Sequence, residues 1–381
     1  MFDFETCPPR KGTDCSKWDY QGGDYIPMWV ADMDLPAPQK VVDALVRRAE
    51  HPVYGYSVVD DRFYDCVVSY YKRLYDFELP RAWIVWVPAV MPGANMACRM
   101  LGGTIMNNTP MYPHIRKLAA ETQLPRLEVP LRQDAAGRYE MDQDAMEAAI
   151  AATLGVTTFI LCSPHNPVGR VFSKEELNQL SAFCSRHGLT VISDEIHSEL
   201  VFDENLHTPY FLADDWAREH SITLTSGAKT YNIPALPMAF AIIPNKALRE
   251  KYEAYIAGLA AVPNVESMEA FLVSYNECAD WKQALLRHLE GNRDYMEQRI
   301  AAMPGVKVTH NEATFLAWID CRAAGLDDPW RFFREKAGVN FNNGVDFGCP
   351  GFVRLNFGCT RAQLTQALDR MENALRERLG S

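Results

Sequence analysis

The sequence has no apolar run that approaches the roughly 20 residues needed to cross a bilayer. It is also short of basic residues, with 38 Lys and Arg against 49 Asp and Glu and a net charge of -11. This balance argues against a nucleic-acid or anionic-membrane partner, because either requires a concentrated basic surface. Residues 1–5 (MFDFE) lack the basic end and apolar stretch of a signal peptide. We therefore expect a cytoplasmic protein.

Paired cysteine motifs are absent as well. The 10 cysteines are scattered at irregular intervals, and no Cys-x-x-Cys occurs. This spacing predicts free thiols in a reducing compartment and no metal site. The 381 residues, 48% of them hydrophobic and 23% charged, have the composition of an ordinary globular protein, and the length favours two domains.

The middle of the chain alternates short apolar segments with helical ones, which predicts an α/β fold with a mainly parallel sheet between helices. The apolar segments are continuous rather than alternating, as expected of strands buried on both faces. A capping box at 173–176 begins a helix that runs to about 187 and ends at Gly188, which completes one β-α-β unit. The predicted strands are 84–87, 158–162, 190–193, 222–224 and 239–243.

The C-terminal third predicts a smaller α+β region that follows one long helical stretch at 265–300. We divide the chain into an N-terminal segment (1–46) that joins the small domain, a large domain (47–275) and a small C-terminal domain (276–381). The elements expected in the small domain are a strand at 315–320, a helix at 330–337, a strand at 352–357 and a helix at 361–376.

Lys229 lies just beyond a predicted strand, in a turn of small residues (TSGAK, 225–229). Most lysines are solvated surface charges, but the ends of parallel strands are where α/β sheets bind ligands. Burial there would lower the pKa of Lys229 and make its amine a nucleophile toward an aldehyde. Ser226 could donate its hydroxyl to a phosphate. Because serine hydrolases use the same Ser-x-x-Lys spacing, a hydrolase built on Ser226 and Lys229 remains an alternative.

The two preceding predicted strands also end in polar side chains. Asp194 and His197 follow one strand (SDEIH, 193–197), and Asn166 follows the other (SPHNP, 163–167). Each has an ordinary interpretation on its own: a helix N-cap for Asp194, a packed core residue for His197 and a turn for Asn166. A lysine with an aspartate that keeps a pyridine nitrogen protonated is, however, the general signature of a pyridoxal-phosphate (PLP) enzyme. Three neighbouring strand ends therefore predict a PLP site.

With these motifs the sequence resembles the aminotransferase class I/II family, which has the fold type I PLP-dependent transferase architecture. It is most similar to the subgroup of MalY/PatB-type cystathionine β-lyases, which are C-S lyases. The resemblance extends over nearly the whole chain. Its further segments are WVADMD (29–34), GYS (55–57), SGAKTYNIPAL (226–236) and GFVRLNFGC (351–359).

The resemblance implies roles for the three strand ends. Lys229 would hold the cofactor as a Schiff base and then remove the Cα proton of the substrate. Asp194 would pair with the pyridine nitrogen. Asn166 would bond the phenolic oxygen and contribute to substrate binding, and His197 stands where relatives often place a tyrosine with that duty.

The resemblance also implies the remaining contacts. Tyr112 would stack on the pyridine ring, although it could equally be a core aromatic. The phosphate would lie at a helix N-terminus, on the backbone N–H groups of Val90 and Met91, with a hydroxyl from Ser226. Within a homodimer, Tyr56 would reach the phosphate of the second subunit. The substrate carboxylate would be clamped by Arg354 and covered by the loop at Val30 and Ala31.

The reaction implied is β-elimination: L-cystathionine or a related L-cysteine S-conjugate is cleaved to a thiol, pyruvate and ammonia. The alternatives are an aminotransferase, which shares the proton abstraction, and a regulatory protein that keeps PLP without efficient chemistry. Pro237 stands where many aminotransferases have a phosphate-binding arginine, which the MalY-like subgroup also lacks. The residues before Tyr112, at 90–93 and at 340–344 differ from the family pattern, which leaves the leaving group open.

Overall fold

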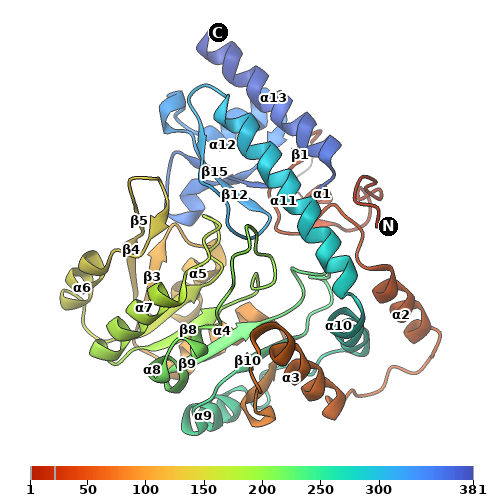
Figure 1. Cartoon of the computed structure of the whole chain (residues 1–381), viewed down its shortest axis with the longest axis vertical. Helices are drawn as coiled ribbons and strands as arrows, with labels where there is room; N and C mark the ends of the chain where they lie inside the picture. Colours follow the sequence, from red (N-terminus) through yellow and green to blue (C-terminus); the bar gives the residue numbers. More distant parts are fainter. Residues whose placement is uncertain (1, 21–22, 381) are drawn as a thin grey trace.

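The computed structural model describes residues 2–20 and 23–380, and its strands form two main sheets (Figure 1). The larger sheet has seven strands in the order β2-β10-β9-β8-β7-β3-β4. The strands from β9 to β4 run parallel, whereas β10 is antiparallel to both of its neighbours. In chain order the strands are β2 (Ile84–Val87), β3 (Thr104–Thr109), β4 (Arg126–Pro130), β7 (Val156–Cys162), β8 (Thr190–Asp194), β9 (Ser221–Thr225) and β10 (Ala239–Ile242).

All five predicted strands of this sheet are present and the sheet is mainly parallel, as predicted; the strand at 239–243 is the antiparallel β10. Two strands were missed. β3 reads Thr-Ile-Met-Asn-Asn-Thr and lacks an apolar run, although all six residues are buried. β4 (Arg-Leu-Glu-Val-Pro) lies at the edge of the sheet, where burial of only one face is sufficient.

Helices cover both faces of the large sheet, and a separate apolar core lies on each face. The predicted capping box is confirmed at the start of α7, where Ser173 and Glu176 bond each other's backbone N–H, and Gly188 ends the helix in the left-handed conformation. One face carries α4 (Val90–Leu101), α5 (Pro113–Thr122) and α9 (Lys246–Ile256); the other carries α6 (Gln143–Ala151), α7 (Lys174–His187) and α8 (Asp215–Glu219). A further core lies between β2, β10, α3 (Asp61–Tyr75) and α10 (Val265–Glu277).

The smaller sheet has the order β11-β12-β15-β14 and packs against α11 and α13, which run beside each other in the upper part of Figure 1. The expected helical stretch at 265–300 is present as two helices, because the chain breaks at Cys278 (φ -109°, ψ 22°) into α10 and α11. The expected helix at 330–337 is α12 followed by a π-helical turn at 333–337. The bounds are β11 (Lys307–Val308), β12 (Leu316–Asp320), β14 (Asn342–Asn343), β15 (Phe352–Asn356), α11 (Ala279–Ala301), α12 (Pro329–Phe332) and α13 (Arg361–Leu379).

The N-terminal residues pack with the C-terminal third of the chain. β1 (Ile26–Pro27) pairs in parallel with β13 (Val339–Asn340), and α2 (Gln39–Ala49) shares one apolar core with α11 and α13. No helix in the described part of the chain is both long and apolar enough to span a membrane. The short elements are α1 (Ser16–Asp19), β5 (Arg132–Gln133) and β6 (Tyr139–Glu140), with 3-10 turns at Arg81–Trp83, Tyr210–Leu212, Arg322–Ala324 and Gly344–Phe347.

Candidate cofactor and substrate site

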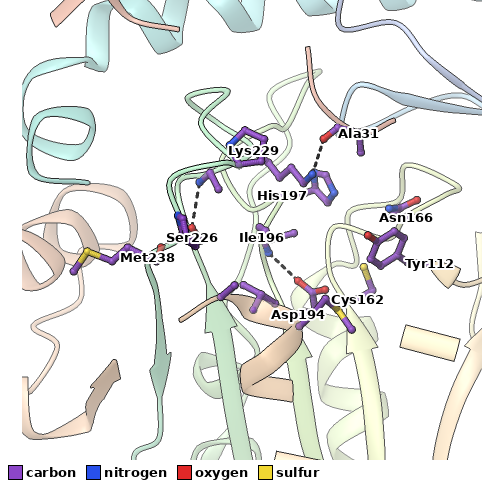
Figure 2. A pocket seen from close by; sticks show the side chains of 16 residues that line it. Ala31, Tyr112, Cys162, Asn166, Asp194, Ile196, His197, Ser226, Lys229 and Met238 are labelled. Carbon is purple, nitrogen blue, oxygen red and sulfur yellow. Dashed lines mark hydrogen bonds between the residues drawn. The ribbon is translucent and has the colours of Figure 1, made fainter. Parts of the chain in front are cut away.

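A cavity of about 180 Å³ opens at the carboxyl ends of β7, β8 and β9 (Figure 2). Because these three strands are adjacent in the sheet, the residues that follow them meet at one edge, as the sequence predicted. Among the residues with predicted roles, those that line the cavity are Ala31, Val90, Met91, Tyr112, Asn166, Asp194, His197, Ser226 and Lys229.

Lys229 extends into this cavity from the turn after β9. Its Nζ donates a hydrogen bond of 2.5 Å to the Ala31 carbonyl, which lies on a loop of the N-terminal segment (Figure 2). Burial lowers the pKa of Lys229 to about 8, although the negative charges of Asp32 and Asp194 oppose this shift. More of the amine is therefore unprotonated near neutral pH than in a solvated lysine, as a nucleophile requires.

Asp194 is the last residue of β8 and lies beneath the cavity. Burial raises the pKa of this carboxyl to about 6, while the hydrogen bond from the Ile196 backbone N–H (3.2 Å) opposes the increase. Near neutral pH the buried carboxylate is ionised, and a cationic ring nitrogen beside it would relieve the cost of its burial.

His197 is fully enclosed in the wall of the cavity. Burial, reinforced by the positive charges of Lys229 and Arg354, lowers the pKa of its imidazole to about 3, so the ring is neutral. Its Nδ1 is buried without a hydrogen-bond partner in the described structure. A buried polar atom without a partner is costly, and a ligand oxygen or donor in the cavity would satisfy it.

The far end of the cavity is closed by the N-terminus of α4. The first backbone hydrogen bond of this helix runs from Gly93 to Ala89, so the N–H groups of Val90 and Met91 have no intrahelical partner. Gly93 brings the helix close to β9, since a Cβ there would lie 2.8 Å from the Leu224 side chain. The helix terminus therefore presents its dipole and donors to the cavity, where an anion would bind.

Ser226 lies at the same end, but its hydroxyl donates to the Met238 carbonyl (2.8 Å) and accepts from the Ala228 N–H (3.2 Å). The predicted donation to a phosphate therefore requires the Met238 bond to be released. Lys229 is hydrogen-bonded to Ala31 instead, so Ser226 and Lys229 do not form the nucleophile-base pair of a serine hydrolase.

Arg354 lies on β15 of the small sheet and is buried behind Asn166. Its guanidinium donates to Asn166 Oδ1 (3.1 Å), to the Trp29 carbonyl (2.8 Å) and to Asn342 Oδ1 (2.5 Å). Burial lowers its pKa to about 10, so it remains a cation at neutral pH. Arg354 is thus next to the cavity, and Asn342, from the unusual segment 340–344, contacts it directly.

Among the predicted site residues, Arg354 lies beside the cavity without lining it, and Tyr56 does not reach the cavity of its own chain. It lies fully exposed on the segment between α2 and α3, at the lower right of Figure 1. Tyr112 does line the cavity, and the centre of its ring lies 5.2 Å from that of His114.

Sequence reasoning assigned no role to several lining residues. They lie beside the predicted motifs, and their side chains carry no group that predicts a role in catalysis or binding. Pro237 entered the sequence analysis only as a departure from the family pattern. In the described part of the chain no group of three His, Cys, Asp or Glu residues could hold a metal ion, and all ten cysteines have free thiols. The additional lining residues are Ala89, Cys162, Ile196, Ala228, Pro234, Pro237 and Met238.

Known proteins share both the sequence and the fold. The model of the aminotransferase class I and II family matches residues 25–371. Cystathionine beta-lyase PatB of Bacillus subtilis is 33% identical over 98% of this chain and 100% of its own length. Protein MalY of Escherichia coli is 32% identical over 99% of each chain.

Among solved structures, cystalysin of Treponema denticola, described with a pyridoxal 5'-phosphate cofactor, matches with a TM-score of 0.93. It is 27% identical, and the match covers 99% of each chain. The central sheet between helices and the smaller sheet are those of the fold type I PLP-dependent transferases. The chain belongs to the aminotransferase class I and II family.

Proposed function

We propose that this protein is a PLP-dependent C-S lyase that cleaves L-cystathionine or a related L-cysteine S-conjugate to a thiol, pyruvate and ammonia. The observation that carries the proposal is the meeting of Lys229 and Asp194 in one cavity, with the donors of the α4 N-terminus at its end. The relatives favour elimination over transamination, because PatB, 33% identical over nearly the whole chain, is named a cystathionine β-lyase.

The residues fit PLP on three counts. Lys229 has an amine of lowered pKa for the aldehyde, the α4 terminus offers Val90 and Met91 N–H groups for the phosphate, and Asp194 is a carboxylate for the ring nitrogen. Asn166 and the unsatisfied Nδ1 of His197 offer polar atoms to the remaining ring substituents. Tyr112 would cover the ring face. When bound, the cofactor supplies an electron sink for the charge that develops at the substrate Cα.

The side chains of this chain bind the substrate and move its proton. Arg354 binds the α-carboxylate with charge-assisted hydrogen bonds, and Asn166 supports the same group. Lys229 takes the Cα proton on Nζ as general base, which is favoured by its lowered pKa. Asp194 would pair with the ring nitrogen of the bound cofactor and so favour its protonated form.

Three further statements belong to this proposal. The enzyme is a homodimer in which Tyr56 reaches the phosphate of the second subunit. It works in the cytoplasm, consistent with its ten free thiols. It divides into a large domain (47–275) and a small domain (276–381) joined by residues 1–46, a division supported by the two sheets and by the core that the N-terminal residues share with α11 and α13.

The test is to incubate the PLP-loaded protein with L-cystathionine and to measure pyruvate and free thiol. We expect both in equal amounts, with no added keto acid. A strict need for a keto acid, with no pyruvate from cystathionine, would make the protein an aminotransferase. A bound cofactor without either activity would point to a regulatory PLP-binding protein.

A further inference from the structure

The loop at 28–35 runs beside the mouth of the cavity and contacts both basic groups of the site. Its Ala31 carbonyl accepts from Lys229 Nζ (2.5 Å), and its Trp29 carbonyl accepts from Arg354 Nη2 (2.8 Å). These bonds place the loop backbone between the amine that faces the cofactor and the guanidinium that faces the substrate. The position of this loop therefore determines the space left for an α-carboxylate.

Two basic side chains outside the loop, Arg10 and Lys17, bind two acidic side chains of the loop, Asp32 and Asp34. Arg10 donates to Asp34 Oδ1 (2.5 Å), to the Met33 carbonyl (3.1 Å) and to Asp32 Oδ2 (2.8 Å). Lys17 Nζ lies 2.7 Å from Asp34 Oδ2 and 3.3 Å from the Asp32 carbonyl oxygen. The Lys17 and Asp34 side chains have no exposed surface. We call Arg10, Lys17, Asp32 and Asp34 the charge latch.

Two neutral side chains also donate hydrogen bonds to the carboxylate of Asp34. Trp18 Nε1 donates to Oδ1 (2.9 Å), and Gln363 Nε2, from α13, donates to Oδ2 (2.8 Å). Hydrogen bonds and charge together hold the pKa of Asp34 below its ordinary value, against the effect of burial. This carboxylate thus joins the N-terminal segment to the C-terminal helix while it carries the loop.

Two asparagines bind the loop from the side of the cavity. Asn232, three residues beyond Lys229, bonds both the N–H and the carbonyl of Met33 (2.9 Å each). Asn356, on the same strand as Arg354, donates to the Asp32 carbonyl (2.6 Å). The segments that carry Lys229 and Arg354 are therefore both hydrogen-bonded to the same loop, which the charge latch also binds.

We propose that Arg10 and Lys17 are positioning residues for substrate binding: through Asp32 and Asp34 they fix the loop at 28–35 where an α-carboxylate can be bound beside Arg354. A bound carboxylate must be met in the right geometry, because charge-assisted hydrogen bonds are strong only over a narrow range of distances and angles. The inference deepens the proposed function and rests on it for the identity of the substrate.

The charge of Asp32 adds a second reason for the arrangement. Asp32 is the leading charge that opposes the lowering of the Lys229 pKa, so its field reaches the cavity. Arg10 neutralises it at 2.8 Å. Without Arg10, Lys17 Nζ, 3.8 Å from Asp32 Oδ1, would be the remaining cation beside this carboxylate, and more of its negative charge would act on the carboxylate of an amino-acid substrate.

The experiment separates positioning from mere stabilisation with two variants, Lys17→Met and the double variant Lys17→Met, Asp34→Asn. The double variant leaves no unpaired buried charge, so it should fold even if the single variant does not. Glycine, which has an α-carboxylate but no leaving group, is titrated into the PLP-loaded protein, and the cofactor absorbance reports its Kd. Pyruvate release from L-cystathionine gives KM and kcat, and thermal unfolding gives Tm.

We expect the Kd for glycine and the KM to rise about tenfold or more in both variants, with PLP still bound and kcat within about twofold. Lys17→Arg should restore most of the affinity, since it keeps the charge. The control is Arg293→Met. It removes another buried cation, which pairs with the partly exposed Asp203 away from the loop, and it should lower Tm without changing either constant.

The inference is overturned if the latch variants have a lower Tm but the same Kd for glycine as the wild-type protein. The proposed function can fail separately. If the unchanged protein binds glycine but releases no pyruvate from L-cystathionine, the lyase assignment is wrong, while the glycine titration still decides the role of the latch.

Discussion

Lys229 has two duties that a single substitution should remove together. Lys229→Ala deletes the amine that would bind the PLP aldehyde and the base that would take the Cα proton. We expect the purified variant to lose the yellow colour of the bound cofactor and its lyase rate to fall by about 10²–10⁴-fold, the usual contribution of a positioned general base. Absorbance and pyruvate release measure the two effects, and Lys246→Ala, at an exposed lysine, is the control. Retention of the colour in Lys229→Ala would show that the cofactor is held elsewhere.

The pKa values of Lys229 and Asp194 predict how uptake of PLP by the cofactor-free protein depends on pH. Lys229 reacts as the free amine, and with a pKa of about 8 only about a tenth of it is free at pH 7. The rate should therefore rise nearly tenfold per pH unit below pH 7, by about fivefold between pH 7 and 8, and level off above pH 8. Below a pH of about 6, protonation of Asp194 removes the partner of the ring nitrogen and should steepen the fall.

Stopped-flow absorbance after mixing cofactor-free protein with PLP measures this profile. Asp194→Asn should lose the additional fall at low pH and keep the rise with pH, shifted to lower pH because the negative charge of Asp194 raises the pKa of Lys229. A rate that keeps rising to pH 10 would mean that Lys229 titrates like an ordinary solvated lysine.

Residue patterns could locate Lys229, Asp194 and Asn166 because each follows a predicted strand, and neighbouring strand ends meet at one edge. They could not reveal Cys162 or Ile196, which line the cavity only because the backbone passes there. The latch was also beyond sequence reasoning. Arg10 and Asp34 are distant in sequence from Lys229, and their connection to it runs through backbone carbonyls.

The contribution of the capping box to the stability of α7 can be measured with one substitution. Ser173→Ala removes the side chain that accepts from the Glu176 N–H at the start of this helix. We expect the free energy of unfolding to fall by about 1 kcal/mol, the typical cost of losing such a cap. Urea unfolding would measure it. Ser185→Ala, at an exposed position of the same helix, is the matched control and should not destabilise the protein.

Elements with strong local signals were predictable and the others were not. The capping box and Gly188 delimit α7, and apolar runs mark β7, β8 and β9. β3 is buried by its neighbours despite two asparagines, so its burial is a tertiary effect. The break between α10 and α11 carries no proline or glycine, and the antiparallel direction of β10 depends on how the chain returns to the sheet.

The large and small sheets are connected by hydrogen bonds between residues of the site. Arg354 on the small sheet bonds Asn166, which follows β7 of the large sheet, and the N-terminal loop contacts both Lys229 and Arg354. The sequence predicted that the N-terminal segment would join the C-terminal third, and this division stays a prediction; in the structure α2 shares an apolar core with α11 and α13. It could not predict the contacts between the sheets, because these depend on side chains brought together only by the complete fold.

A second subunit is expected from the segment between α2 and α3. Val53, Tyr54, Tyr56 and Val58 are all exposed there, which is unusual for apolar and aromatic side chains so close together. If Tyr56 completes the phosphate site of a partner, Tyr56→Ala should weaken PLP binding by about tenfold or more, the cost of one lost hydrogen bond to a charged group. Sedimentation should give a dimer, and equilibrium dialysis the affinity for PLP.

Mixing two variants tests whether Tyr56 acts across the interface. In a dimer of Lys229→Ala with Tyr56→Ala, one site lacks both residues and the other has both, because Lys229 and Tyr56 come from different chains. After exchange of equal amounts of subunits, roughly half of the dimers are mixed. One of the two sites in each mixed dimer is intact, so about a quarter of all sites should contain both residues. At a PLP concentration too low to fill Tyr56→Ala alone, activity should therefore exceed that of either variant. If Tyr56 acted within its own chain, both sites of the mixed dimer would remain defective, and mixing would produce no gain.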